Sequence, residues 1–117
     1  MRHGNNKRKF GKVRKVRKAL INSLALNLIV RGRIKTTEPK AKELRPFIEK
    51  LVTSAKKDDT ATRRLVISKL SNRRPEVKKL FEVIAPKYKN TKGGYTRVLK
   101  LDARKSDGAK MAIIEFI

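Results

Sequence analysis

The sequence predicts an α+β fold in which about four helices pack on a small three-stranded sheet, antiparallel or mixed, preceded by a basic extended N-terminal arm. Apolar residues recur at helical spacing through the middle of the chain, and two strand-like runs around a loop close it. A chain of 117 residues suffices for one domain with a modest core. We therefore expect residues 1–11 to form a flexible arm and residues 12–117 a single compact domain.

The first helix is expected over residues 12–31. Leu20, Leu24 and Leu28 recur there at a spacing of four, as the apolar face of a helix requires. Gly32 follows at the position of a C-terminal cap, where glycine adopts the left-handed conformation at little cost. The helix is therefore predicted to end at this glycine.

A short strand and a second helix are expected next. Residues 33–37, RIKTT, are predicted to be the strand. Thr37 followed by Glu38 and Pro39 predicts a helix start, because proline is tolerated in the first turn and an acid suits the positive end of the helix dipole. The apolar stripe of this helix comprises Leu44, Ile48, Leu51 and Ala55. Pro46 is expected to kink or restart it.

Two further helices and a hairpin complete the prediction. Asp58 or Asp59 is expected to cap a third helix that ends near Leu70, and Pro75 to open a fourth that Pro86 closes. The apolar positions of the third are Ala61, Leu65 and Leu70, and those of the fourth are Val77, Leu80, Phe81 and Ile84. The runs YTRVLKL and KMAIIEFI then predict strands joined by a loop, with which the strand at residues 33–37 can pair.

Positive charge dominates the composition and is concentrated at the start of the chain. There are 33 Lys and Arg against 10 Asp and Glu, a formal net charge of +23. No acidic residue occurs before Glu38, whereas residues 1–37 hold twelve of the basic ones. Such a chain repels itself unless a polyanion neutralises it. Nucleic acid is therefore the first expected partner and an anionic membrane surface the second.

The residue types that most catalytic and metal sites need are scarce. The absence of cysteine and the single histidine exclude a thiolate site and a His-based metal cluster. Asp58 and Asp59 are better explained as a helix cap than as an acid–base pair. Gly93 and Gly94 lack the spacing and the Lys-Ser/Thr pair of a nucleotide-binding loop. We therefore expect no enzymatic activity, no cofactor and no small-molecule substrate.

The basic start followed by the apolar run ALINSLALNLIV has the general form of a secretion signal. Asn22, Ser23 and Asn27 interrupt the run, no small-residue cleavage site follows it, and it is too short to span a bilayer. A mitochondrial presequence fits the Arg-rich, acid-poor start better. The apolar run is needed for the core, however, so we expect neither a signal nor a membrane span.

The stretch KGGYTR, residues 92–97, is a local candidate for a binding site. Its glycines would let the backbone approach a phosphate closely, Tyr95 would stack or hydrogen-bond, and Arg97 would pair with a phosphate or a sugar. The alternative is a plain turn before a strand, with Tyr95 packed in the core. The flanking Lys89 and Lys92 favour the binding interpretation.

Several stretches together resemble one known family. The chain contains, in the family's order, MRH, IKTTEPKAKELRPFIEKLV, ATRRL, LFEVIAPKY, GGYTRVLKL and MAIIEFI, which are similar to the bacterial large-subunit ribosomal protein L17 family. The resemblance implies a structural ribosomal protein that binds large-subunit rRNA near the exit of the peptide tunnel, beside neighbouring ribosomal proteins. Because it begins at Met1, it favours a bacterial cytoplasmic protein. Pro46 replaces a basic or polar residue of the family, which predicts a less straight second helix.

The expected mechanism is electrostatic, because Lys and Arg replace counterions condensed on RNA phosphates and the arm becomes ordered when it enters RNA. The expected RNA-binding residues of the arm and the first helix are Arg2, His3, Lys7, Arg8, Lys9, Lys12, Arg14, Lys15, Arg17 and Lys18. Those of the remaining chain are Arg31, Arg33, Lys35, Lys40, Lys92, Gly93, Gly94, Tyr95 and Arg97. For His3, stacking on a base and simple solvation are equally good interpretations.

Two other classes of protein share part of this description. A DNA-compacting architectural protein would carry similar charge, but it would usually dimerise and present an apolar wedge or a basic ribbon to a groove. A nucleic-acid-modifying enzyme would need a carboxylate or metal cluster, which the sequence does not display. A preference for folded RNA over duplex DNA at matched salt would separate the first class from an rRNA-binding protein.

Overall fold

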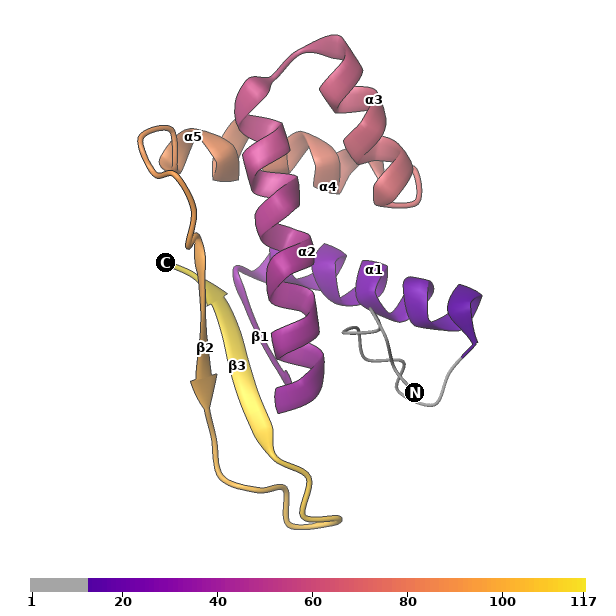
Figure 1. The fold of residues 1–117 in the computed structure, drawn as a ribbon, viewed down its shortest axis with the longest axis vertical. Helices are drawn as coiled ribbons and strands as arrows, with labels where there is room; N and C mark the ends of the chain where they lie inside the picture. Colours follow the sequence, from indigo (N-terminus) through magenta and orange to yellow (C-terminus); the bar gives the residue numbers. More distant parts are fainter. Residues whose placement is uncertain (1–12) are drawn as a thin grey trace, which may run out of the picture.

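The computed structural model describes residues 13–117. The expected arm at residues 1–11 lies outside the described residues, and so do the six expected RNA-binding residues Arg2, His3, Lys7, Arg8, Lys9 and Lys12. Within the described part, the α+β prediction is confirmed. Helices pack against a three-stranded antiparallel sheet with the strand order β1-β3-β2 (Figure 1).

Helix α1, Arg14–Arg31, ends as the sequence predicted. Gly32 adopts φ 79° and donates its N–H to the carbonyl of Leu28 at 2.7 Å. The predicted row of leucines is only partly correct, since Leu20 and Leu24 are half-buried. The buried residues of α1 are Asn22, Ala25, Leu28 and Ile29. A helix turns every 3.6 residues, so a strict spacing of four drifts off the packed face.

The sheet joins the short strand β1, Arg33–Thr37, to the C-terminal hairpin of β2, Thr96–Lys100, and β3, Met111–Phe116. Strand β3 is central and pairs antiparallel with both neighbours. Ile34, Ile114 and Val98 stand in register across the three strands and pack with the core. Both the hairpin and its pairing with residues 33–37 are therefore confirmed.

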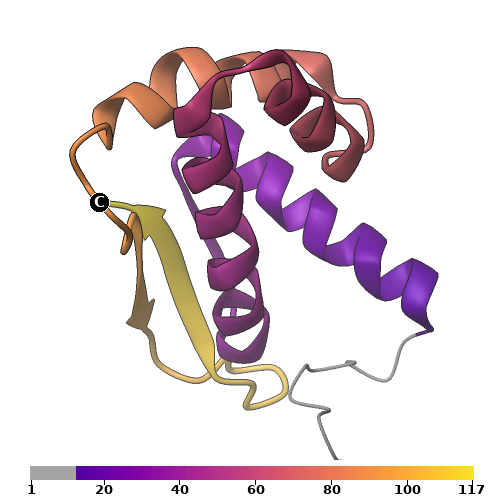
Figure 2. The same ribbon diagram turned by 45° about the horizontal axis from the view of Figure 1, so that its top comes forward.

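Helix α2, Glu38–Lys57, is the centre of the fold and lies between the sheet and α1 (Figure 2). Its buried residues are Ala41, Leu44, Ile48, Leu51, Val52 and Ala55, which include the whole predicted stripe. The helix continues past Pro46, so the predicted restart is wrong. Pro46 removes the amide that would bond the carbonyl of Lys42, but both residues are exposed and water can satisfy that carbonyl.

Helix α3, Thr60–Lys69, begins at the predicted cap, because the Asp59 carboxylate accepts a hydrogen bond from the Thr62 amide at 2.7 Å. Its packed face differs from the prediction, since Ala61 and Leu65 are exposed. Leu70 is fully buried as predicted, and Val66 is fully buried in place of Leu65. This ten-residue helix carries apolar residues on several sides, so its sequence allows more than one rotation about the helix axis. The contact with α2 decides which side faces the core.

The last helical segment comprises α4, Arg74–Lys79, a π-helical turn η1, Leu80–Ile84, and α5, Ala85–Lys87. Its predicted apolar positions are all buried, namely Val77, Leu80, Phe81 and Ile84. The predicted end at Pro86 is wrong, because the segment continues to Lys87. The ring of Pro86 would clash with the carbonyl four residues earlier in a regular α-helix. The wider π-turn directly before it relieves this clash.

Asp107 closes the loop between β2 and β3. Its carboxylate is 2.7 Å from Nη2 and 3.0 Å from Nε of Arg104, and it accepts a hydrogen bond from the Ala109 amide at 3.1 Å. The hydrogen bonds from Arg104 are the main cause that lowers the pKa of Asp107 from 3.8 to about 2. A carboxyl whose folded pKa is depressed stabilises the fold above its unfolded pKa, and this contribution disappears as the pH falls through the folded value.

We therefore expect the Asp107 carboxyl to titrate near pH 2 in the folded protein, and the loop contribution to be lost between pH 3.8 and about 2. Measuring the carboxyl chemical shift against pH by NMR tests this directly. Arg104→Gln should raise the pKa of Asp107 toward its ordinary value, while strands β2 and β3 stay paired. Titration of Asp107 at or above 3.8 in the wild-type chain would contradict the prediction.

Candidate nucleic-acid interface

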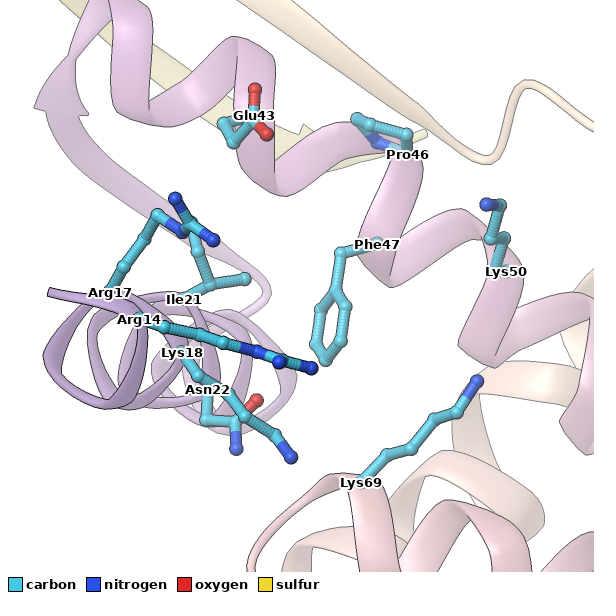
Figure 3. Close-up of a pocket in the computed structure, with 10 residues that line it drawn as sticks. All are labelled: Arg14, Arg17, Lys18, Ile21, Asn22, Glu43, Pro46, Phe47, Lys50 and Lys69. Atoms are coloured by element: carbon cyan, nitrogen blue, oxygen red, sulfur yellow. The ribbon is translucent and has the colours of Figure 1, made fainter. Parts of the chain in front are cut away.

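A cleft of about 390 Å³ opens between α1, α2 and the end of α3 (Figure 3). Five cationic side chains line it: Arg14, Arg17, Lys18, Lys50 and Lys69. Three apolar residues line it as well: Ile21, Pro46 and Phe47. Asn22 and Glu43 complete the lining. We call this feature the basic cleft, since cations around an apolar floor are its defining property.

The basic cleft carries more positive than negative charge, since five cationic side chains and one carboxylate line it. Across residues 13–117, no ion pair joins a carboxylate to any of these five side chains. Glu43 is the acidic member of the lining, and it has a partner of its own. A concave surface with this excess of positive charge concentrates anions.

Helical geometry positions the cleft residues. Arg14, Arg17 and Lys18 lie three and four residues apart on α1 and therefore share one face. Phe47 and Lys50 have the same relation on α2, and the turn into α3 brings Lys69 opposite them. The three α1 cations were predicted from the sequence, whereas Phe47, Lys50 and Lys69 were not. The spacing of Phe47 and Lys50 could have indicated a shared face, but nothing in the sequence places Lys69 beside them.

The basic cleft continues toward the KGGYTR loop. A second cavity of about 500 Å³ shares Pro46, Lys50 and Lys69 with the cleft and extends to Gly93 and Tyr95. The two lysines therefore stand between the α1 cations and the glycine pair. Glu49 also lines the second cavity, so the positive charge there comes from these two lysines alone among its lining residues.

A second group of predicted cations lies on one face of the sheet. Arg33, Glu115 and Arg97 stand in register across β1, β3 and β2. The Glu115 carboxylate is 2.7 Å from Nε of Arg97 and 3.7 Å from Nε of Arg33. Lys35 is exposed on the same face, next to Arg33 along β1. Both arginine side chains remain more than half exposed, at 61% and 56%, so one carboxylate pairs with two cations that still face solvent.

Tyr95 belongs neither to the basic cleft nor to the cations on the face of the sheet. Only 1% of it is exposed, and its ring packs against Tyr88 with centroids 5.2 Å apart. Its hydroxyl bonds Thr53 Oγ1 at 3.0 Å and accepts a hydrogen bond from Lys56 Nζ at 3.1 Å. This burial contradicts the expectation that the ring stacks on RNA, and it agrees with the alternative in which Tyr95 packs in the core.

The ionisation of the two tyrosines reflects these surroundings. Burial raises the pKa of Tyr95, but its hydrogen bonds with Thr53 and Lys56 and the positive charge of Lys56 outweigh this effect, so the net pKa lies below the ordinary value. Burial raises the pKa of Tyr88, whose hydroxyl donates to the carbonyl of Ile117 at 2.7 Å. Neither tyrosine is positioned to exchange a proton with a substrate, because both hydroxyls are used to hold the fold together.

The remaining predicted residues differ in position. Lys92, Gly93 and Gly94 are exposed in the loop, where Gly94 adopts φ 66°, a conformation that favours glycine. Lys56 also donates to the carbonyl of Thr91, which ties this loop to α2. Three other predicted cations lie outside both surface groups: Lys15, Arg31 and Lys40.

The described part of the protein holds no cluster of three or more His, Asp or Glu side chains able to bind a metal ion. None of its helices is long and apolar enough to cross a membrane. The fold, the basic cleft and the cationic face of the sheet define a small basic α+β protein, with the clustered positive charge that is typical of nucleic-acid-binding proteins. Comparison with known proteins makes this more specific.

The model of the ribosomal protein L17 family matches residues 20–117. The chain is 52% identical to the large ribosomal subunit protein bL17 of Nautilia profundicola, over 100% of this chain and 98% of that protein. It is 51% identical to the protein of the same name from Persephonella marina, over 100% and 95% of the two chains. The chain belongs to the ribosomal protein L17 family, as the sequence motifs indicated. Membership in a family of ribosomal proteins also agrees with the expectation that it is not an enzyme.

Proposed function

We propose that this protein is a structural constituent of the large ribosomal subunit in the cytoplasm, where it binds and stabilises folded large-subunit rRNA near the exit of the peptide tunnel. Family membership supports the ribosomal part of the proposal. The observation that carries the RNA part is the basic cleft, whose five cations have no carboxylate partner within residues 13–117.

Binding follows from the release of counterions. Each Lys or Arg that contacts an RNA phosphate displaces condensed cations, which makes affinity fall with salt concentration. The sheet face adds Arg33, Lys35 and Arg97, and the exposed glycine loop adds Lys92. Contacts of this kind read the shape of folded RNA more than its sequence. Residues 1–11 are proposed to form the basic arm that extends this surface along the RNA.

Titration of the purified chain with large-subunit rRNA over a series of salt concentrations tests the proposal. Lys18→Gln, Lys50→Gln and Lys69→Gln together should lower the slope of log affinity against log salt by roughly 2, because each lost phosphate contact removes about 0.7–0.9. Three exposed lysines outside the cleft, Lys78, Lys87 and Lys105, serve as a matched control with the same loss of charge.

Equal effects of the two triple variants would show that net charge, rather than the cleft, governs binding. A parallel titration with duplex DNA of matched length, at matched salt, is the second part of the experiment. Tighter binding to the duplex, together with a stable dimer, would overturn the proposal in favour of a DNA-compacting architectural protein. Crosslinking in cells, followed by sequencing of the bound RNA, tests the position near the tunnel exit.

A further inference from the structure

The basic cleft has a property that phosphate binding alone does not require. Its cations surround an apolar floor made by Phe47, Ile21 and Pro46. Its volume of about 390 Å³ lies within the range of roughly 300–1,000 Å³ that is typical of sites for small ligands. The cleft therefore has room for a compact group with an apolar body, and its rim favours negative charge.

Phe47 lies at the edge of the core, so part of its ring can contact a ligand in the cleft. On α2 it stands three residues after the fully buried Leu44 and directly before the fully buried Ile48. The ring packs partly against the core, yet it also lines the cleft. Figure 3 shows it projecting from α2 toward α1, with the side chain of Arg14 reaching toward it, whereas Lys69 extends from α3 toward Lys50.

The chemistry of the lining selects among occupants. A free phosphate would pair with the cations but leave the apolar floor in contact with water. An apolar peptide would cover the floor but bury cations without partners, which is costly. An unpaired nucleotide satisfies both parts, because its base has a π-face that stacks on an aromatic ring and its phosphate pairs with Lys or Arg. Asn22, held by its hydrogen bond to Ser71 Oγ at 3.1 Å, adds an amide to the wall.

We infer that the basic cleft receives one unpaired nucleotide of folded RNA, with its base stacked on Phe47 and its phosphates paired with the surrounding cations. This inference rests on the proposed function, since it assumes that rRNA is the partner. Lys50 and Lys69 are the expected phosphate contacts on the side of the KGGYTR loop, because they line both cavities. The α1 cations, of which Lys18 is one, are the contacts on the opposite wall.

The full-length chain bound to large-subunit rRNA provides the test. Phe47→Leu keeps an apolar side chain but removes the stacking surface, and it should weaken affinity about tenfold while leaving the salt slope unchanged. Lys50→Gln should instead lower the slope by somewhat less than about 1. Phe116→Leu is the matched control, because Phe116 is also partly buried and lies outside the cleft. It should leave affinity unchanged.

Ultraviolet crosslinking of the wild-type complex is the second measurement, and it requires no variant to fold. Mass spectrometry should find a nucleotide adduct on the peptide that contains Phe47. Absence of that adduct, or unchanged affinity of a folded Phe47→Leu variant, overturns nucleotide insertion while wild-type rRNA binding still supports the proposed function. Failure of the wild-type chain to prefer rRNA over duplex DNA overturns the proposed function itself.

Discussion

Tyr95→Ala is expected to lower the free energy of unfolding by about 3–5 kcal/mol, the usual cost of truncating a buried aromatic side chain. Tyr95 is only 1% exposed, and its ring contacts Tyr88 at a centroid distance of 5.2 Å. The substitution also removes hydrogen bonds to Thr53 and Lys56. Affinity for rRNA, corrected to the folded fraction, should stay the same because the ring does not reach the surface.

Chemical denaturation, combined with rRNA titration at several salt concentrations, measures both quantities. Tyr95→Phe is the control, since it keeps the ring and removes only the hydroxyl. It should cost less than the alanine variant, about 1–2 kcal/mol for the lost hydrogen bonds. A stable Tyr95→Ala variant with weakened rRNA binding would contradict the core assignment and restore the stacking interpretation.

Removal of residues 1–11 is expected to produce the largest loss of salt-dependent binding. This segment contains four basic residues, Arg2, Lys7, Arg8 and Lys9. If each contacts a phosphate, the slope of log affinity against log salt should fall by roughly 3. The body should remain folded, because the residues of the described core lie within 21–116. Thermal unfolding and rRNA titration of the shortened chain test the two statements separately.

A full-length variant with these four residues replaced by glutamine is the matched control. It should reproduce the change in slope, since the effect is assigned to charge rather than to chain length. Unfolding of the shortened chain would mean that the arm belongs to the core. An unchanged affinity at moderate salt would mean that the arm is not an electrostatic anchor.

The elements that the sequence predicted correctly depend on a few neighbouring residues. Gly32 ends α1 because glycine tolerates its positive φ, and Asp59 caps α3 because its carboxylate reaches the Thr62 amide. The three strands follow from local apolar and β-branched runs. Such determinants act over one or two turns and need no knowledge of the remaining chain.

Two of the incorrect predictions depend on distant contacts, and the one at Pro86 depends on the turn directly before it. Val66, rather than Leu65, enters the core because α3 packs against α2 in one particular rotation. Pro86 does not end the last helix, since the wider π-turn before it accommodates its ring. Tyr95 is buried because Tyr88, Thr53 and Lys56 surround it, although its place in KGGYTR resembles an exposed turn.

The candidate interface likewise combines features that the sequence determines with features that only the tertiary structure determines. The sequence by itself determined the net charge of +23, the acid-free start, the α+β class and the family motifs, because these depend on composition and local order. Only the tertiary structure decided that Lys50 and Lys69 join the α1 cations around Phe47. Their convergence depends on the packing angles of three helices. Those angles are set by the volumes of side chains in contact, which no short stretch of sequence encodes.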